Sequence, residues 1–459
     1  MTEAHIDVTA ILARFATARR GPVTGAARAD VARCVLDTVA VSIAALPNPG
    51  LTIFDAWAAT ESAAGPCAVW GRAARTAPAA AALRNGTAAH VLDYDDLVPG
   101  RPSHPSVVLL PALLAVADAR GHDFDQVAPA FMVGSATFRA FADALPHTEH
   151  YDRGWHTTST VGRVAAVTAL AHLVGLDEGA TRRALGIVTS LAAGSLANFG
   201  TMVKPMHSGA AARDAVLAVD LAERGLTANG SALEARGGFV DLYGSPDDAR
   251  LAALPALLEA EYDGWRTDWA LKQYPACYGT NRAIDAALAL RAQLGGALPD
   301  DIESVRVVTH PTCLRPLLRR RAEHGQEARF SMEYVVATAL AQGGLTLVDF
   351  EPEGFAANRE NSLIDRVTMS EADVPPVGPP DYSEGYTVVT IETASGDRLS
   401  VRRDVTHGDS SDPLTDAELL AKVRDCFRAG GLDQNEAEST LSHWLAWTSG
   451  IESPAASTS

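Results

Sequence analysis

Paired cysteines, a basic surface and long apolar runs are all absent from this 459-residue sequence. The five cysteines are odd in number, widely spaced and form no C-x-x-C pair, which argues against a disulfide framework and against a zinc or iron–sulfur site. The formal net charge is −18, and so acidic a surface repels nucleic acid and anionic membranes. Charge or glycine interrupts every apolar stretch well before the ~18 residues that a membrane span requires. We therefore expect no nucleic-acid partner and no membrane partner.

The bulk properties predict a folded chain with two structural units. Its length exceeds what one hydrophobic core usually supports. Hydrophobic residues make up 47% and charged residues 20%, the balance of a globular protein. The N-terminal sequence MTEAHIDVTA lacks the basic and apolar regions of a secretory signal, so a cytoplasmic location is expected. Because an acidic surface also disfavours anionic substrates, an enzyme for polycarboxylates needs a local basic pocket.

Residues 1–267 have a helical pattern almost throughout and predict a helical domain. Val31, Val35, Val39 and Ile43 recur at every fourth residue, which places them on one helix face. Many segments are rich in alanine on nearly all faces, which indicates helices packed inside a bundle. Further helices are predicted at Val107–Ala119, Thr160–Val174, Thr181–Leu196 and Ala210–Arg224.

Residues 268–406 predict a smaller α+β domain. Ser304–Thr309 alternates apolar and polar residues, as a half-buried strand does. Tyr386–Thr393 and Arg398–Arg402 flank the tetrapeptide Ala-Ser-Gly-Asp, which predicts a β-hairpin. Asp365–Met369 is a further candidate strand.

Residues 407–459 return to a helical pattern. Thr415 and Glu418 have the spacing of a capping box, and Ala417–Ala429 continues as a helix. This stretch is too short to hold its own core, so it is expected to pack against residues 1–267. The polar tail Ser453–Ser459 is expected to be disordered. The predicted fold class is therefore mainly α, with a smaller α+β domain inserted between two helical segments.

Ionisable residues gather in four places within otherwise alanine-rich sequence. The first is RNGTAAHVLDYDD at residues 84–96, followed by SHPS at residues 103–106. If a helix runs from Gly86 to Asp93, His90 and Asp93 lie one turn apart on the same face. The three neighbouring carboxylates repel one another, so burial is expected to raise the pKa of at least one. Solvated helix caps are the alternative interpretation, and a metal site built on the three aspartates lacks the glycine and glutamate of a calcium loop.

Two further clusters precede helical segments. His156 lies in GWHTT at residues 154–158, where a helix dipole disfavours the protonated imidazole and leaves a neutral proton acceptor. Simple capping of the helix is the structural alternative. Lys204 lies in VKPMHSG at residues 203–209. Because lysine is scarce in this chain, a lysine between apolar residues is either an anion receptor or a surface residue with its amine in water.

The fourth cluster, LKQYPACYGTN at residues 271–281, begins the α+β domain. Together with ARFSMEY at residues 328–334, the clusters occur in an order that resembles the MmgE/PrpD family. That family includes 2-methylcitrate dehydratases, cis-aconitate decarboxylases and iminodisuccinate epimerases. The resemblance extends from about residue 5 to about residue 450.

The resemblance implies a helical domain made from both chain ends, a smaller α+β lid, a homodimer, and no obligatory metal or organic cofactor. It also implies a small polycarboxylate substrate, bound between the helical domain and the lid. Four matching residues are expected to be catalytic, namely His104, His156, Asp93 and Tyr334. Four others are expected to bind substrate, namely Lys204, Lys272, His207 and Cys277.

Three positions depart from decarboxylases of the family. Leu97 stands where those enzymes have threonine, Cys277 where they have a lid histidine, and Asn281 where a histidine is expected shortly afterwards. These departures favour dehydration of a 2-methylcitrate-like hydroxy acid over decarboxylation of cis-aconitate. The alternative interpretations are an epimerase or decarboxylase of a related acid, and a non-catalytic carboxylate-binding relative.

The three family reactions share one difficulty, because each builds up negative charge beside a carboxylate that is already anionic. Preorganised cations lower such a barrier, and the two lysines of the clusters are the candidates for the basic pocket. Imidazole titrates near neutral pH, so His104 or His156 is expected to act as general base, with the other histidine or Tyr334 as acid. Asp93 is expected to orient one of the histidines.

Overall fold

The computed structural model describes residues 6–61, 63–101, 103–145, 147–245, 247–265, 269–318, 320–371 and 385–450. The chain divides into two compact units. The first consists of Met1–Val91, Asp95–Thr267 and Cys426–Ser459, and the second of Leu92–Tyr94 and Asp268–Asp425. The tripeptide Leu92–Tyr94 therefore belongs to the second unit, although the residues on both sides of it belong to the first. Along the described ranges, no helix combines the length and the apolar character needed to cross a membrane.

The first unit is mainly helical, and α8 (Thr157–Val174) lies at its centre. This helix is buried on nearly all faces, as its alanine-rich sequence indicates. Four helices pack most extensively against it: α5 (Ser106–Arg120), α6 (Phe124–Ala144), α9 (Glu178–Leu191) and α10 (Val203–Glu223).

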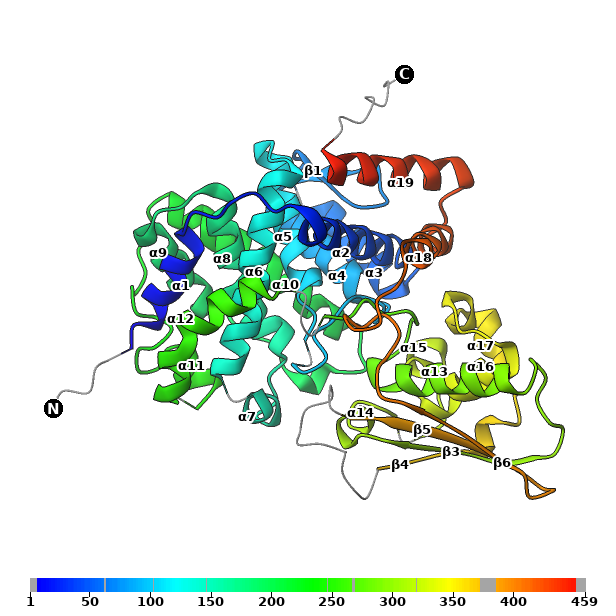
Figure 1. Ribbon diagram of the computed structural model, residues 1–459. Helices are drawn as coiled ribbons and strands as arrows, with labels where there is room; N and C mark the ends of the chain where they lie inside the picture. The colour runs from blue at the N-terminus through cyan, green and yellow to red at the C-terminus, as the bar shows by residue number, and fades with distance from the viewer. Residues whose placement is uncertain are drawn as a thin grey trace. The chain divides into compact units, whose positions relative to one another are not determined.

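Both ends of the chain contribute to the first unit. Near the start of the chain, α2 (Gly25–Ala44) lies beside α19 (Gln434–Ser449), which is near its end (blue and red in Figure 1). The other elements described in this unit are α1 (Val8–Thr17), α3 (Pro49–Glu61), β1 (Cys67–Ala68), β2 (Arg75–Thr76), α4 (Pro78–His90), α7 (His147–Asp152), η1 (Leu196–Asn198), α11 (Phe239–Tyr243) and α12 (Asp248–Asp263).

Two glycines allow α4 and α10 to approach each other closely. A Cβ atom on Gly209 of α10 would lie 2.1 Å from the carbonyl oxygen of Leu83 and 2.7 Å from the backbone nitrogen of Thr87, both in α4. A Cβ atom on Gly86 would lie 2.8 Å from the Cα atom of Gly209. The backbones are therefore in direct contact, and this contact sets the distance between the end of α4 and the first turns of α10.

Substitution of Gly209 by alanine is expected to destabilise the first unit by about 1–3 kcal/mol or more, because the new methyl group meets backbone atoms that cannot move aside. The urea midpoint of unfolding measures the effect. Gly179→Ala in α9 is the matched control, since a Cβ atom there meets its nearest atom at 3.4 Å and alanine favours helix over glycine. Equal stability of the two variants would contradict the close approach of α4 and α10.

The second unit contains a four-stranded mixed sheet in the order β4-β3-β5-β6. Its strands are β3 (Ile302–Thr309), β4 (Val367–Glu371), β5 (Thr387–Thr393) and β6 (Arg398–Arg403). β3 pairs with β4 in parallel and with β5 in antiparallel orientation, and β5 and β6 form an antiparallel hairpin.

Two helices, α13 (Tyr278–Gln293) and α16 (Met332–Gln342), pack against the sheet of the second unit and against each other (Figure 1). Their apolar side chains join those of β3 and β5 in one core. The remaining elements described in this unit are α14 (Pro311–Leu314), α15 (Gly325–Ala328), η2 (Leu347–Phe350), α17 (Pro352–Asn358) and η3 (Ile364–Arg366). The division between the units falls within α18 (Asp416–Ala429).

The predicted fold class is confirmed at the level of a mainly α chain with a small mixed sheet. The strand predicted from alternation is β3, and the predicted hairpin is β5–β6. The capping box at the start of α18 is present, because the backbone nitrogen of Thr415 donates to Glu418 Oε2 at 2.7 Å and that of Glu418 to Thr415 Oγ1 at 3.2 Å. The helix predicted to reach Leu196 ends at Leu191, where the backbone of Ala192 becomes extended. The tail Ser453–Ser459 lies outside the described residues.

Candidate active site

Four imidazoles of the first unit gather where several helices begin or end. His90 is the last residue of α4, His156 directly precedes α8, His207 lies near the start of α10, and His104 lies in the loop before α5. The ring centre of His90 lies 4.6 Å from that of His104 and 6.0 Å from that of His156. The ring centre of His156 lies 5.4 Å from that of His207. Three of the histidines predicted from sequence are thus brought together, and His90 joins them.

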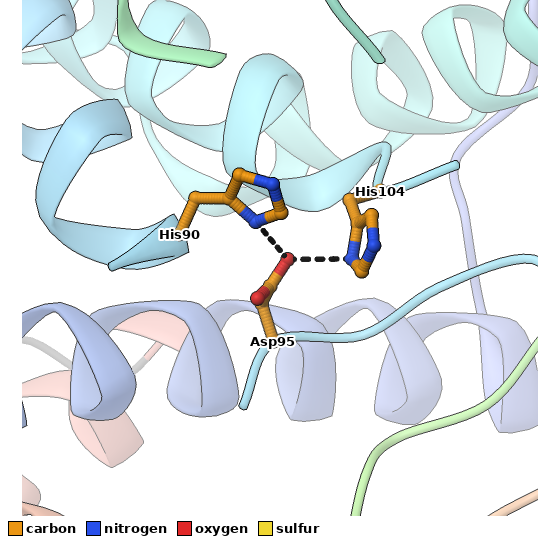
Figure 2. Close-up of side chains that lie close together, drawn as sticks. All are labelled: His90, Asp95 and His104. Atoms are coloured by element: carbon orange, nitrogen blue, oxygen red, sulfur yellow. Dashed lines mark hydrogen bonds and ion pairs between the residues drawn. The ribbon is translucent and has the colours of Figure 1, made fainter. Parts of the chain in front are cut away.

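The carboxylate that holds two of these histidines is Asp95. Its Oδ2 atom lies 2.7 Å from Nδ1 of His104 and 2.9 Å from Nδ1 of His90, and Figure 2 shows it between the two rings. The condition considered from sequence, a helix that reaches Asp93, is not met, because α4 ends at His90. The carboxylate seen to orient a histidine is therefore two residues further along the chain than the one predicted from sequence.

Asp95 keeps its charge although its side chain is fully buried. Burial alone would raise the pKa of its carboxyl group, but the hydrogen bonds and charges of His90 and His104 hold that pKa well below its usual range. The sequence predicted a raised pKa for at least one of the three neighbouring aspartates. The pKa of Asp95 is lowered instead, because the Nδ1 atoms of His90 and His104 both face its Oδ2 atom.

His156 and His207 form a second pair of imidazoles. Their Nδ1 atoms lie 3.2 Å apart, so one ring donates a hydrogen bond and the other accepts it. The side chain of His156 makes no capping hydrogen bond to α8, although the residue occupies the N-cap position. Burial, with smaller contributions from neighbouring positive charges, holds the pKa of His156 well below its ordinary value and lowers that of His207 to about 4. Both rings are therefore neutral at pH 7.

Lys204 lies in the first turn of α10 and supplies a positive charge beside the histidines. Its side chain is almost completely buried, and Nζ lies 5.4 Å from the ring centre of Phe199. The same phenylalanine ring packs edge-on against His156, with the ring centres 4.9 Å apart. After burial, the charge of Lys204 is one of the causes that lower the pKa values of His90, His156 and His207.

His90, Asp95 and His104 are the one group in the described part of the chain whose ligand-type atoms lie within 4.8 Å of one another. Two imidazoles and a carboxylate are suitable donors for zinc in general. Here, however, both Nδ1 atoms lie at hydrogen-bonding distance from an ionised carboxylate, and a nitrogen that donates its proton has no lone pair for a metal. We therefore treat the three side chains as a hydrogen-bonded network.

In the second unit, the predicted residues Asp93 and Lys272 form an ion pair. Lys272 Nζ lies 3.2 Å from Asp93 Oδ2 and donates to the backbone oxygen of Asp93 at 2.6 Å. Both side chains are buried. Asp93 has a φ of 52°, the one positive φ outside glycine along the described residues. Such backbone strain persists only where surrounding contacts enforce it.

Three buried cations hold three consecutive backbone carbonyl groups of the second unit. Arg329 donates to the oxygen of Leu92 at 3.2 Å, Lys272 to that of Asp93, and Lys422 to that of Tyr94 at 3.0 Å. The arrangement explains why this tripeptide belongs to the second unit. It also accounts for the enforced positive φ at its middle residue.

Tyr334 and Cys277 also lie in the second unit. The hydroxyl group of Tyr334 donates to the backbone oxygen of Asp349, and burial raises its pKa to about 12. The residue lines a cavity that also includes the arginines Arg320, Arg321 and Arg359. Cys277 is the buried N-cap residue of α13, and its backbone nitrogen donates to the oxygen of Arg329 at 2.9 Å.

Comparison with known proteins identifies the family. Residues 10–252 match the MmgE/PrpD N-terminal domain, and residues 274–445 match the MmgE/PrpD C-terminal domain. The chain belongs to the MmgE/PrpD family. The resemblance first noted from five ordered motifs is thus confirmed across both halves of the chain.

The curated relatives of this MmgE/PrpD chain are enzymes. It is 29% identical over 409 residues to the cis-aconitate decarboxylase of Homo sapiens, covering 85% of this chain and 82% of that protein. It is 30% identical over 370 residues to the cis-aconitate decarboxylase of Mus musculus, covering 78% of this chain and 73% of that protein. Similarity to the 2-methylcitrate dehydratase of Salmonella typhimurium is 28% over 134 residues, covering 28% of this chain and 27% of that protein.

Four residues of these networks were not chosen from sequence: His90, Asp95, Arg329 and Lys422. His90 and Asp95 lie within the first quoted motif, but the position of the helix end decides which aspartate meets a histidine. Lys422 was missed altogether. The rarity of lysine could have pointed to it, because the chain has just three lysines, at positions 204, 272 and 422, and all three are buried. Buried lysines are rare unless they are paired.

The neutral histidines make the stability of this MmgE/PrpD chain depend on pH. The pKa values of His90 and His207 are lowered to about 4, mainly by burial, against about 6.5 in an unfolded chain. Between these values the unfolded chain binds more protons than the folded one. The free energy of unfolding is therefore expected to fall as the pH falls from about 6.5 to about 4. Urea unfolding across this range measures the slope.

His207→Gln should reduce that slope, because one of the buried neutral rings is removed. His443→Gln, on the exposed side of α19, is the matched control and should leave the slope as in the original chain. A slope in His207→Gln as steep as that of the control, or steeper, would show that this ring is not kept neutral by the fold.

Proposed function

We propose that this chain is a lyase that acts at the carbon next to a carboxylate of a small polycarboxylic acid, and that it dehydrates a 2-methylcitrate-like hydroxy acid. The observation that supports this most strongly is the set of acceptors around Nδ1 of His104, which lies 2.7 Å from Asp95 Oδ2 and is hydrogen-bonded to the backbone oxygen of Asp96 at 2.9 Å. An ionised carboxylate at Nδ1 keeps the proton on that nitrogen, so the lone pair of His104 is on Nε2. A ring in this state is suited to removing a proton from carbon.

The proposed reaction begins with transfer of the proton on that carbon to His104 Nε2. The carbon–oxygen bond of the neighbouring hydroxyl group then breaks, and the proton held by His104 leaves with the hydroxide as water. Lys204 stabilises the charge that develops on the carboxylate during proton removal. His156, kept neutral by burial, donates a hydrogen bond to the departing hydroxyl group.

We assign the donor role to His156 and not to Tyr334, because the tyrosine hydroxyl already donates to a backbone carbonyl. Asp93, Lys272 and Cys277 of the second unit stay predictions from sequence, as does the homodimer. The departures at Leu97, Cys277 and Asn281 favour the hydroxy acid over cis-aconitate.

Decarboxylation is the second candidate, and a specific observation favours it. The two mammalian relatives, each of which matches more than three quarters of this chain, are cis-aconitate decarboxylases. In that reaction the bond to the carboxyl carbon breaks, CO2 leaves, and the electron pair on the remaining carbon takes a proton from protonated His104. The same residues serve both reactions, but the protonation state needed at the start is opposite.

A substrate panel in D2O tests the proposal. Purified protein is incubated with 2-methylcitrate, citrate and cis-aconitate, and the products are analysed by mass spectrometry and CO2 release. Loss of water, with a rate that falls on acidification because the general base must begin the reaction without its proton, supports the dehydratase. CO2 release with one deuterium on the product carbon, and a rate that falls at alkaline pH, replaces it by the decarboxylase. Binding without turnover across the panel contradicts both reactions.

A further inference from the structure

Asp95 is shared between two imidazoles of which His104 alone is assigned a step in the reaction. One oxygen, Oδ2, is hydrogen-bonded to Nδ1 of His90 and lies 2.7 Å from Nδ1 of His104, and Figure 2 shows both contacts. The side chains of His90 and Asp95 are completely buried, whereas 14% of the His104 side chain is exposed. A ligand can therefore reach His104 more readily than His90, and the inner ring must have another role.

The hydrogen bonds determine where the protons lie. An ionised carboxylate has acceptors and no donor, so Nδ1 of each ring carries a proton. Nδ1 of His104 also lies 2.9 Å from the backbone oxygen of Asp96, a second acceptor on the same nitrogen. The backbone nitrogen of His104 donates to Thr158 Oγ1 at 3.1 Å, which fixes the position of the residue. His104 therefore presents Nε2 as its basic atom.

His90 is neutral and one of its nitrogens has no partner. Burial lowers its pKa to about 4, in spite of the opposing effect of Asp95. Along the described residues, neither His90 Nε2 nor Asp95 Oδ1 has a hydrogen-bond partner. Burial of an unsatisfied polar atom costs free energy that an apolar ring of the same shape would avoid. Packing alone therefore does not account for a histidine at this position.

We propose that His90 is a positioning residue: by taking up part of the accepting capacity of Asp95 Oδ2, it limits how strongly this carboxylate holds a proton on His104. The hydrogen bond from Nδ1 of His90 also keeps Asp95 Oδ2 aligned with Nδ1 of His104. The catalytic meaning of this proposal rests on the function proposed above, but the proton positions can be measured without any substrate.

Other charged groups of the first unit also influence the His90 ring and must be kept constant in the test. Lys204 of α10 and His156, which precedes α8, lie close enough to influence the His90 ring, and the rings of His90 and His156 are nearly parallel, at 19°. Asp96 accepts a hydrogen bond from Ser106 Oγ. None of these residues is altered in the test, so a changed titration reports the Asp95 network.

The test compares three substitutions by one direct measurement and uses a fourth to assign signals. Asp95→Asn removes the charge and keeps an acceptor. His90→Phe removes the donor and keeps a ring, whereas His90→Asn keeps a donor close to the place of Nδ1. Nuclear magnetic resonance of histidine labelled with 15N and 13C in the ring follows the tautomer and titration of His104. A spectrum of His104→Gln assigns its signals among the 13 histidines of the chain.

The expected shifts have opposite signs. Loss of the charge in Asp95→Asn should move the titration of His104 to lower pH, by roughly one to three units. Loss of the competing donor in His90→Phe should move it to higher pH, by up to about one unit. His90→Asn should restore the original titration. The acid limb of the pH profile of kcat/KM should move in the same directions.

Three results would overturn the proposal. The first is a neutral His104 with its proton on Nε2 in the original chain. The second is a titration in His90→Phe that moves to lower pH or does not move. The third is a failure of His90→Asn to reverse the effect of His90→Phe when both variants are folded. Absence of turnover on the acid panel, with the expected titrations, would contradict the proposed function and leave this inference standing.

Discussion

Replacement of His104 by glutamine is expected to lower kcat/KM on the acid that the chain turns over by about 10²–10⁴-fold, the range by which a positioned general base accelerates proton transfer. Glutamine matches the length of the imidazole side chain, but its amide takes up no proton near neutral pH. Steady-state kinetics measure the loss, and calorimetric titration with the same acid measures binding. Binding should persist, because Lys204 still provides the positive charge.

The matched control for this variant is His172→Gln. His172 lies in the last turn of α8, and its Nδ1 bonds to the backbone oxygen of Ala16 at 2.8 Å, outside the four-histidine group. The control should keep near-normal turnover. If His104→Gln has the same turnover as the control, while its unfolding midpoint is unchanged, the assignment of the base is wrong.

The helical part and the α+β part of the chain could be predicted because the spacing of apolar residues along the sequence indicates helix or strand locally. The alanine-rich sequence of α8 indicated burial on all faces, and α8 is the helix around which the first unit packs. Alternation predicted β3 and the β5–β6 hairpin. The register of β3 with β4 was beyond such reasoning, since a parallel pair between residues about 60 positions apart has no local signal.

Which aspartate of the first motif contacts the histidines could not be predicted from the sequence. Residues 90–96 offer three aspartates after one histidine, and the pairing depends on the residue at which α4 stops. The helix ends at His90, Asp93 has a positive φ, and Asp95 is the aspartate that lies against the two rings. A difference of a few residues in a helix end is below the resolution of periodicity.

The positive φ of Asp93 is enforced from far along the chain. The cations that hold Leu92, Asp93 and Tyr94 are 237, 179 and 328 residues away in sequence. No local sequence pattern predicts contacts between residues so far apart, and for this reason Lys422 was not predicted as part of the network. A count of lysines would have raised the question, because an acidic chain that has three lysines and buries all of them uses each one for a specific contact.

Lys204→Met is expected to change activity and acid stability in opposite directions. Loss of the cation should lower kcat/KM by roughly 10²–10³-fold, the usual effect of removing one preorganised group that faces developing charge. Burial is the main reason for the low pKa values of His90 and His207, and the charge of Lys204 adds to it. Without that charge, both pKa values rise towards their ordinary value. The loss of stability between pH 6.5 and pH 4 should therefore become smaller.

Lys204→Arg separates the charge from the geometry of the amine. Arginine keeps the positive charge, so the acid dependence of stability should resemble that of the original chain, whereas kcat/KM should fall partially because a planar guanidinium does not place its donors as an ammonium group does. Kinetics and urea unfolding at pH 7 and pH 5 are measured on both variants. A general structural defect lowers stability at both pH values. An unchanged acid dependence in Lys204→Met would mean that Lys204 does not act on the histidines. Unchanged kcat/KM in the same variant would mean that the charge assigned to it in the reaction comes from another group.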